Sequence, residues 1–503
     1  MLAVYGSSFL AIVDANIVIV ALPQVRAALR AGPEAYQWVL DAYTLCLCVF
    51  ALSAGALADR YGRKKILLLG VGLFAAGSVV CASAPSVAVL VAGRFLQGAA
   101  AAAMASSALS LLVAAFPAGA ARTRALTWWS TSAALATVVG PAAGGLLVDR
   151  LGWQAVFWVN LPICALIVLV GARTLRESRS TTGTSLDPAG QVLLIGWLAA
   201  LIYALIEGGR AGWTAAPIVG ALGAAVVLFA LFVVVERRRD DPMVPVSLLR
   251  SRAFGGAGAV AFLLGAAPVS AYVFIPLFLQ SVQGASAGEA GLLVLPMAAG
   301  NVIGSQVSGR WIARSGPRTP SCASLTIAGT ALLAVAFLEP GSSPLVAMAP
   351  LLFLGIGLGM ALPATNDAAF RAVDSARSGA AAGLLGALRQ SGHAVGIAVQ
   401  GTIIAAVATH RLTTELAARD VPAPVVASAG EAALSGRDAA TRLPGTGLPP
   451  EALVDVATRA FTGGFHTIMT LAGVVCLGAA VLAAATVPGS TVINGTGGTR
   501  GRR

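Results

Sequence analysis

Long apolar runs separated by short polar connections make up most of this chain. An α-helix rises 1.5 Å per residue, so about 20 apolar residues cross the roughly 30 Å hydrocarbon layer of a bilayer. Most of the runs have this length or come close to it, and we predict that each forms a membrane-spanning helix. The fourteen predicted spans are Leu2–Leu22, Ala42–Leu57, Ile66–Ala84, Val87–Ala114, Thr127–Val148, Ala155–Gly171, Ala189–Ile206, Ala215–Val235, Phe254–Leu279, Ala287–Ile312, Ser321–Leu338, Leu345–Thr365, Ala380–Ala408 and Phe465–Val487.

Basic residues are distributed unequally between the two sides of this predicted topology. Short cytoplasmic loops of membrane proteins carry an excess of Lys and Arg, which places the loops after the even-numbered spans, and both chain termini, in the cytoplasm. The short outer loops hold only Arg26, Arg30, Arg150 and Arg210. The predicted cytoplasmic loops hold Arg60, Arg63, Lys64, Lys65, Arg122, Arg124, Arg173, Arg176, Arg179, Arg237, Arg238, Arg239, Arg250, Arg252, Arg310, Arg314, Arg318, Arg371 and Arg377.

The composition leads to the same prediction. Hydrophobic residues make up 57% and charged residues 11% of 503 residues, whereas soluble domains carry about 25% charge. The net charge of +12 reflects the basic loops, so we do not expect a nucleic-acid partner. The six cysteines lie inside apolar runs, the three histidines are scattered, and no nucleotide-binding loop or metal-ligand pattern is present. We therefore predict no metal, nucleotide or other cofactor.

The first cytoplasmic connection, Gly55–Lys65, reads GALADRYGRKK. It resembles the signature between the second and third spans of the major facilitator superfamily. The residues at the defining positions are Gly55, Asp59, Arg60, Gly62, Arg63 and Lys64. The resemblance implies a cytoplasmic gate, in which Asp59, Arg60 and Arg63 latch that side closed in the outward-facing state. An ordinary basic loop is the alternative.

The same resemblance implies an all-α polytopic protein with the major facilitator fold, in which two six-helix bundles are related as parallel repeats. Gly309, Arg314 and Gly316 repeat the glycine and arginine spacing of the first loop, with Ala313 in place of the aspartate. Spans seven and eight are then an inserted pair. The predicted domains are 1–172, the N-terminal bundle; 173–252, linkers with the inserted helices; 253–487, the C-terminal bundle with a poorly ordered external loop at 409–464; and 488–503, a cytoplasmic tail.

Asp14 lies about 13 Å from the outer end of the first predicted span, which places it near mid-membrane. A carboxylate at that depth costs about 3 kcal/mol or more unless it is paired, hydrated or protonated, so it is a candidate functional group. The surrounding residues resemble the first-span pattern of fourteen-span drug:proton antiporters, with Asn16 and Ile19 as departures. A structural acid that is permanently paired is the alternative.

Arg94 lies within the fourth predicted span and, with Gln97 and Gly98, resembles the R-x-x-Q-G signature of the family. A guanidinium inside a span needs a partner or water, and Asp14 is the obvious candidate. We predict that the two residues couple transport to protons: burial favours the neutral acid, while Arg94 favours the carboxylate. Alternatively, Arg94 only braces neighbouring helices.

The fifth predicted span contains ATVVGPAAGGLL. Its closely spaced small residues predict tight helix contact and a kink. The stretch also resembles a signature found in exporters of the superfamily, with Ala136 in place of the first glycine. The residues that carry this antiporter-type motif are Gly140, Pro141, Gly144 and Gly145.

Several other polar residues are weaker candidates for a cavity or a proton relay. Arg389 and His393 lie four residues apart and therefore on one face of the thirteenth span. The remaining candidates are Gln97, Trp38 and Tyr43, the latter two with membrane anchoring as the alternative. We expect Asp41, Glu207 and Glu289 to be solvated near outer span ends.

These features predict a secondary transporter rather than an enzyme. We expect a monomeric drug:proton antiporter of the bacterial inner membrane, with small amphipathic organic compounds, protons and membrane lipid as its partners. A proton-coupled importer or lipid flippase of the same fold, and a membrane receptor or scaffold that moves no solute, are the alternatives.

Overall fold

The computed structural model describes the chain except residues 33, 117–119, 180–186, 240–245, 374–377, 435, 440–442, 444–445 and 489–503. The described residues form helices and no strand, which confirms the all-α prediction. The first half contains α1 (Leu2–Ala28), α2 (Glu34–Tyr61), α3 (Arg63–Ala82), α4 (Val87–Ala115), α5 (Ala120–Leu151), α6 (Ala155–Trp158), α7 (Asn160–Thr174), α8 (Pro188–Ala211), α9 (Ala216–Arg238) and η1 (Val246–Arg250).

The second half contains further long helices, some of them broken by short segments. They are α10 (Arg252–Leu264), the π-helix η2 (Gly265–Val269), α11 (Ser270–Ser281), α12 (Ala287–Leu293), α13 (Leu295–Ser315), α14 (Arg318–Val335), η3 (Pro344–Ala347), α15 (Met348–Phe370), α16 (Ser378–Ala417), α17 (Ala423–Ser428), η5 (Ala429–Ala432), η6 (Gly436–Asp438) and α19 (Pro450–Thr486). Each predicted span overlaps at least one of these helices, and the spans Ala155–Gly171, Phe254–Leu279 and Ala287–Ile312 are each divided between two or three.

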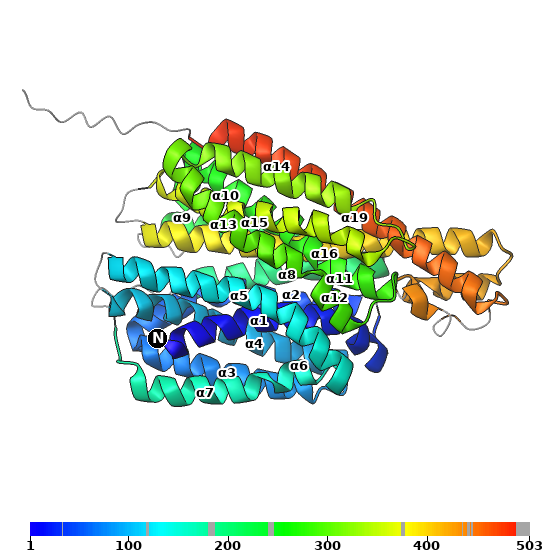
Figure 1. The fold of residues 1–503 in the computed structure, drawn as a ribbon, viewed down its shortest axis with the longest axis horizontal. Coiled ribbons are helices and arrows are strands. Elements are labelled where there is room, and N and C mark those ends of the chain that lie inside the picture. Colours follow the sequence, from blue (N-terminus) through cyan, green and yellow to red (C-terminus); the bar gives the residue numbers. More distant parts are fainter. Residues whose placement is uncertain are drawn as a thin grey trace, which may run out of the picture.

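The helices gather into two bundles (Figure 1). The N-terminal bundle contains α1–α7, where α3 packs on α4, α4 on α2, and α1 on α5. The C-terminal bundle contains α10–α19, where α13 packs on α15, and α14 on both α15 and α19. Helix α16 contacts α2, and α12 contacts α5, so the two bundles meet along these pairs.

Helices α8 and α9, the predicted inserted pair, pack against each other, and α8 also contacts α2 and α16. The pair is joined at one end by a capping interaction. Asp187 accepts a hydrogen bond from the Gly190 amide at 2.8 Å, and its carboxylate lies 3.0 Å from the Arg239 guanidinium beyond α9. A carboxylate at a helix N-terminus stabilises the unpaired amides of the first turn, which explains where α8 begins.

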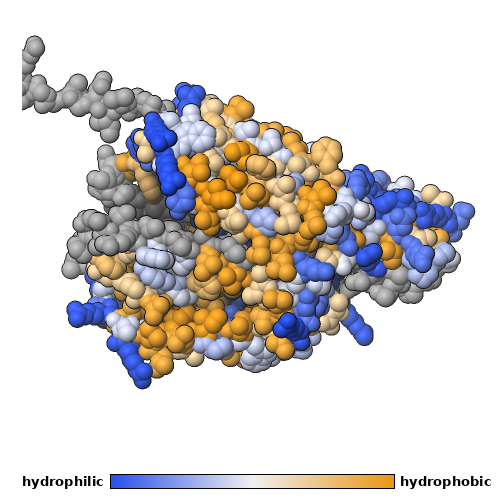
Figure 2. Space-filling model, in the orientation of Figure 1, coloured by the Kyte–Doolittle hydropathy of each residue, from blue (hydrophilic) through white to orange (hydrophobic). Residues whose placement is uncertain are grey.

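The exterior matches a membrane-embedded protein. Hydrophobic side chains form a broad band across the middle of the face seen in Figure 2, and hydrophilic side chains gather at the two ends of the long axis. Many large apolar side chains, such as Val226 on α9 and Leu166 on α7, are exposed on this surface. A soluble domain rarely exposes so many, whereas a surface that faces lipid does. Among the described residues, 11 helices are long and apolar enough to cross a membrane, or up to 12 if the bent α2 counts as one span. The number fourteen stays a prediction.

We call the end of the molecule that carries Met1 and Gly62 the cytoplasmic end, after the sequence prediction, and the opposite end the outer end. The end of α19 also lies at the cytoplasmic end (Figure 1). At the outer end, the C-terminal half of α16, α17 and the start of α19 project beyond the rest of the molecule.

The prediction of a poorly ordered loop at 409–464 is wrong at both ends of that range. Helix α16 continues to Ala417, and α19 begins at Pro450. Leu412 and Leu416 on α16 are buried in one apolar cluster with Val456 and Phe461 on α19. These residues have helical spacing, which the Ala, Pro and Gly content of the segment obscured. The predicted tail lies outside the described residues from 489 onward, as does Arg377 of the predicted cytoplasmic loops.

Candidate functional site

Asp14 and Arg94 form a buried ion pair inside the N-terminal bundle. Arg94 Nη1 on α4 donates to Asp14 Oδ2 on α1 at 2.5 Å. The side chains of Asp14 and Arg94 are 0% and 1% exposed, so water does not reach either charge. Removing one member of such a pair leaves an uncompensated buried charge, which costs about 3–5 kcal/mol. The pairing predicted from the sequence is therefore present, whereas its role in proton coupling stays a prediction.

Two neutral amide side chains complete the hydrogen bonds of the Asp14 carboxylate, and a serine binds both amides. The Asp14 Oδ1 atom accepts from Gln97 Nε2 at 3.1 Å and from Asn160 Nδ2 at 2.7 Å. Ser78 Oγ on α3 accepts from the same two amides, at 2.9 Å and 3.1 Å. We call Asp14, Arg94, Gln97, Asn160 and Ser78 the polar cluster; it joins α1, α3, α4 and α7.

The guanidinium of Arg94 has further partners on α2. Its Nε donates to the Val39 carbonyl at 3.2 Å, and its central carbon lies 4.3 Å from the centre of the Tyr43 ring. The Tyr43 hydroxyl in turn donates to the Ala11 carbonyl on α1 at 2.9 Å. Arg94 therefore braces α2 as well as pairing with Asp14, so the two interpretations of this residue are compatible. A cation over an aromatic face adds about 0.5–2 kcal/mol when desolvated.

Asn160 and Ser78 were not identified as site residues from the sequence. Asn160 is the first residue of α7, after a break that separates α6 from α7. A buried amide needs hydrogen-bond partners, and a break in a span is where such a side chain finds them. Ser78 donates to Phe74 of its own helix, as serines in apolar helices often do, so it gave no signal.

The glycines of the α5 motif lie on two contact faces. Gly140 and Gly144 pack on α1 at Asn16 and Ile17. Gly145 lies against the carbonyl of Ala287 on α12, so closely that a Cβ would overlap it. The carbonyl of Pro141 lies equally close to Gly291. The motif therefore lets α5 touch both its own bundle and the other one.

An acidic side chain extends this contact between the bundles. Asp149, near the end of α5, accepts from Ser286 Oγ at 2.9 Å and from the Gly288 amide at 2.8 Å at the start of α12. Ser286 also caps α12 together with Glu289, which is exposed as predicted. These contacts join the two bundles at the outer end.

The basic loop at the cytoplasmic end is folded against its own bundle. Arg63 Nη2 at the start of α3 lies 2.7 Å from Asp59 Oδ1 near the end of α2, and Arg60 lies over the Tyr61 ring. Lys64 Nζ donates to the Ala172 carbonyl at 2.7 Å. Gly62 has φ +116°, which lets the chain turn from α2 into α3.

A residue of the predicted linker anchors this loop. The carboxylate of Glu177 accepts from the backbone amides of Lys64 at 3.0 Å and Lys65 at 3.2 Å, at the N-terminus of α3. It also fills the space beside Gly62. Glu177 was not predicted as a site residue, although it is the one acid in the basic stretch from Arg173 to Arg179.

The remaining predicted candidates lie elsewhere. Trp38 Nε1 donates to Glu207 on α8 at 3.0 Å, so the two residues join α2 to the inserted pair. Glu207 was predicted to be solvated, whereas its carboxylate is bound to Trp38. Arg389 and His393 lie on α16, where their backbone packs against Gly265 of the π-helix η2. No hydrogen bond among the described residues connects Arg389 or His393 with the polar cluster.

The prediction for Asp41 is wrong. Asp41 is 0% exposed, and neither of its carboxyl oxygens has a hydrogen-bond partner among the described residues. Its position near the outer end of α2 suggested contact with water, but neighbouring helices cover it.

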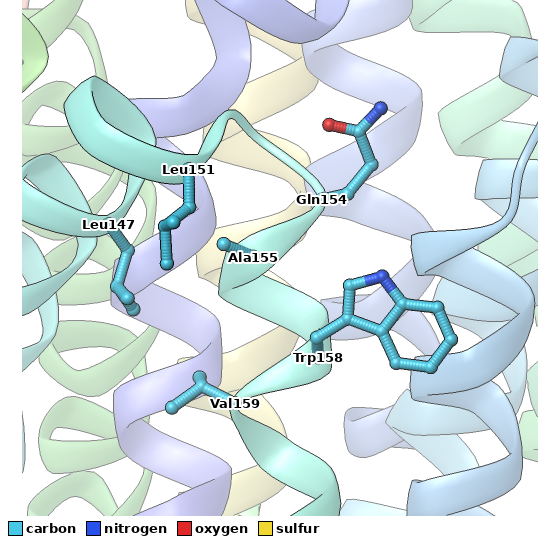
Figure 3. Close-up of a pocket in the computed structure, with 6 residues that line it drawn as sticks. All are labelled: Leu147, Leu151, Gln154, Ala155, Trp158 and Val159. Carbon is cyan, nitrogen blue, oxygen red and sulfur yellow. The ribbon is translucent and has the colours of Figure 1, made fainter.

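A surface pocket of about 630 Å³ lies where α5 ends and α6 begins (Figure 3). Its lining consists of Leu147, Leu151, Gln154, Ala155, Trp158 and Val159. None of these side chains titrates, so this pocket is separate from the chemistry of the polar cluster. Likewise, the described residues include no group of His, Cys, Asp and Glu side chains that could hold a metal ion.

Comparison with known proteins places the chain among transporters. The family model of the Major Facilitator Superfamily matches residues 4–397. The chain is 39% identical over 417 residues to "Multidrug resistance protein Stp" of Mycobacterium tuberculosis, covering 83% of this chain and 77% of that protein. It is 32% identical over 488 residues to "Tetracenomycin C resistance and export protein" of Streptomyces glaucescens, covering 96% and 90%.

The fold has relatives among solved structures. A bacterial homologue of the human lysosomal transporter Spinster, in an inward-facing and occupied conformation, superposes with a TM-score of 0.66. The alignment covers 96% of each chain at 18% identity. At this identity the likeness concerns the fold alone.

Proposed function

The chain belongs to the Major Facilitator Superfamily, and from that premise we propose that it exports amphipathic organic compounds in exchange for protons, by alternating access between its two bundles. Its relatives include proteins named for multidrug resistance, tetracenomycin C export and methylenomycin A resistance. Those names support efflux as the direction of transport and antibiotic-like molecules as the substrate class. The chain is a multi-pass membrane transporter and not an enzyme.

The observation that carries the proton-coupling part is the buried polar cluster. Its single carboxylate is held by one cation and two amides from α4 and α7. Protonation of Asp14 would remove the charge that these donors share. The attraction between Arg94 on α4 and Asp14 on α1 would then weaken, because a neutral acid binds a guanidinium far more weakly than a carboxylate does.

Helix α1 can pass such a change on to the contact between the bundles. Ile17 and Val20 of α1 lie against Gly144 of α5. The next residue of α5, Gly145, contacts Ala287 of α12. We propose that a shift of α1 against α5 loosens this outer contact in one protonation state and restores it in the other. The proton gradient would supply the energy: one elementary charge moving inward gains about 2.3 kcal/mol per 100 mV.

We propose that the protein works as a monomer in the cell membrane, with both termini in the cytoplasm and no cofactor. The loop Gly55–Lys65 would close the cytoplasmic end in the outward-facing state. The scarcity of acids in the spans favours lipophilic substrates that are neutral or weakly cationic.

The test compares wild type with Asp14→Asn in an efflux-deficient bacterial host, over a panel that includes tetracenomycin-like and methylenomycin-like compounds. Wild type should raise the tolerated concentration of some members several-fold, and the variant should not, although it is inserted to the same level. Everted vesicles should then show substrate-dependent proton release for wild type only. Glu451→Gln, which alters an exposed acid at the outer end, is the matched control. Uphill export by Asp14→Asn with intact proton exchange would contradict the proposal.

A further inference from the structure

Asp41 is a second buried acid, and it lies between the two bundles. It follows Gln37 by one helical turn and precedes Cys48 by two, so the three side chains share one face of α2. Gln37 lies against Gly401 of α16, and Cys48 Sγ lies 3.2 Å from Ser391 Oγ of the same helix. Asp41 therefore faces α16 between these two contacts, at what we call the α2–α16 seam.

The charges of the polar cluster do not face Asp41. Arg94 reaches α2 at Val39 and Tyr43, each two residues from Asp41 and thus on the opposite side of the helix. Asp14 is on α1, and the guanidinium of Arg94 lies between it and α2. No part of the polar cluster can therefore neutralise an ionised Asp41.

The charges of the other adjoining helices are directed elsewhere as well. On α16 the facing stretch Ala394–Gly401 contains no charged residue, and its amide Gln400 donates to η2 and to Ser270 at the start of α11. Arg389 and His393 flank Ser391 by two residues each and so point away from α2. On α8, Glu207 accepts from Trp38. Leu45 and Ala398 add an apolar surrounding.

An ionised carboxylate without partners is too costly to bury, and such a group takes up a proton instead. In the outer-closed arrangement Asp41 must therefore be a neutral acid. Parting α2 from α16 would admit water and allow the group to ionise. We propose that Asp41 is a second proton-binding site, separate from Asp14, which takes a proton from the outer solution before the α2–α16 seam closes.

The step involves one bond. A proton from outer water forms an O–H bond on the Asp41 carboxylate as the seam closes, and the same bond breaks, returning the proton to outer water, when the seam opens. Because the proton enters and leaves on one side, it does not add to the number of protons exchanged per substrate. It makes closure of the outer end depend on the outer pH. This inference rests on the alternating access of the proposed function.

The experiment measures outer closure directly, without substrate. Spin labels at Leu151 on α5 and Leu292 on α12, which are 70% and 50% exposed, report the distance between the bundles at the outer end. The labelled protein, in a background without its native cysteines, is placed in lipid nanodiscs and measured between pH 5 and 9. One linked proton predicts up to about a tenfold change in the ratio of closed to open molecules per pH unit.

Because the protonation of Asp14 is proposed to act on the same outer contact, every protein in this test carries Asp14→Asn, so that Asp41 is the acid whose titration is measured. This background, with Asp41 or with Asp41→Glu, should show the pH dependence, with closure favoured by acid. Asp41→Asn should stay closed over the whole range, because its amide mimics the protonated acid. Asp41→Leu should do the same, and it replaces the amide variant if that variant is poorly produced. Retention of the slope of the Asp14→Asn background by either neutral variant at Asp41, or a flat response of that background itself, overturns the proposal. Since the readout needs no transport, it remains decisive if the efflux panel fails.

Discussion

Asp149 at the end of α5 accepts a hydrogen bond from Ser286 Oγ at 2.9 Å, although the two residues belong to different bundles. The Gly288 amide donates to the same oxygen at 2.8 Å. A carboxylate of the N-terminal bundle thus caps the first helix turn of α12 in the C-terminal bundle. The two bundles are therefore joined at the outer end by hydrogen bonds to a carboxylate, and not by apolar packing alone.

Replacing Asp149 by alanine should therefore favour the outward-open state. Both lost hydrogen bonds go to a charged acceptor at a partly exposed site, so we expect a cost of about 1–2 kcal/mol and a closed-to-open ratio about tenfold lower. Distances between spin labels at Leu151 and Leu292 measure this ratio. Glu289→Gln is the matched control, because that acid caps α12 without touching the other bundle. An unchanged ratio in Asp149→Ala would show that the contact is incidental.

A side chain at Gly145 should prevent outer closure by collision. Gly145→Ala places a Cβ against the Ala287 carbonyl, where no rotamer relieves the overlap. Efflux should fall at least tenfold while the protein remains inserted and folded. Gly220→Ala on α9 tests the same substitution where a Cβ meets no atom within 4 Å, and it should transport normally. Drug susceptibility and expression are measured together, and normal efflux by Gly145→Ala would contradict this outer contact.

The ion pair of Asp14 and Arg94 should show strong coupling in a double-mutant cycle. Arg94→Leu alone leaves a buried carboxylate and should destabilise the protein by about 3–5 kcal/mol. Combining it with Asp14→Asn should recover much of that loss, because the remaining groups are neutral. Thermal unfolding in detergent measures the three variants against wild type. Additive effects of the two single changes would show that the charges do not depend on each other.

Asn160→Ala should weaken the polar cluster without altering its charge. The change removes the amide that donates to Asp14 at 2.7 Å and to Ser78 at 3.1 Å. We expect about 1–3 kcal/mol of lost stability and a shifted pH dependence of efflux, since the carboxylate loses one stabilising donor. Gln280→Ala on α11, whose amide donates only to its own helix, is the control. If the pH dependence of efflux in Asn160→Ala is identical to that of wild type, the role of Asn160 is structural only.

At the cytoplasmic end, Asp59→Asn should abolish efflux while leaving inserted protein. Its carboxylate holds Arg63 at 2.7 Å, and the amide cannot replace that charge. Glu177→Gln should reduce efflux less, because its carboxylate binds backbone amides that an amide oxygen still accepts from. Vesicle transport of a substrate from the panel measures both variants. Wild-type rates for Asp59→Asn would remove this loop from the gate.

The candidate site could be predicted only in part. Asp14 and Arg94 were expected to meet because two charges inside lipid must find each other or water, and few alternatives existed. Asn160 and Ser78 are neutral, and such residues can also satisfy their hydrogen bonds within their own helix. Asp41 was misplaced because hydropathy locates a residue along the membrane normal and says nothing about which helix covers it.

The sequence by itself determined that this is an all-helical membrane protein of the superfamily, since lipid forces every backbone amide into a helix and the motifs are local in the chain. Only the tertiary structure decided which polar groups meet. The contacts of Asp149 with α12, of Glu177 with α3 and of Cys48 with α16 join residues more than a hundred positions apart. They depend on how the helices pack within and between the two bundles, which no local pattern of residues specifies.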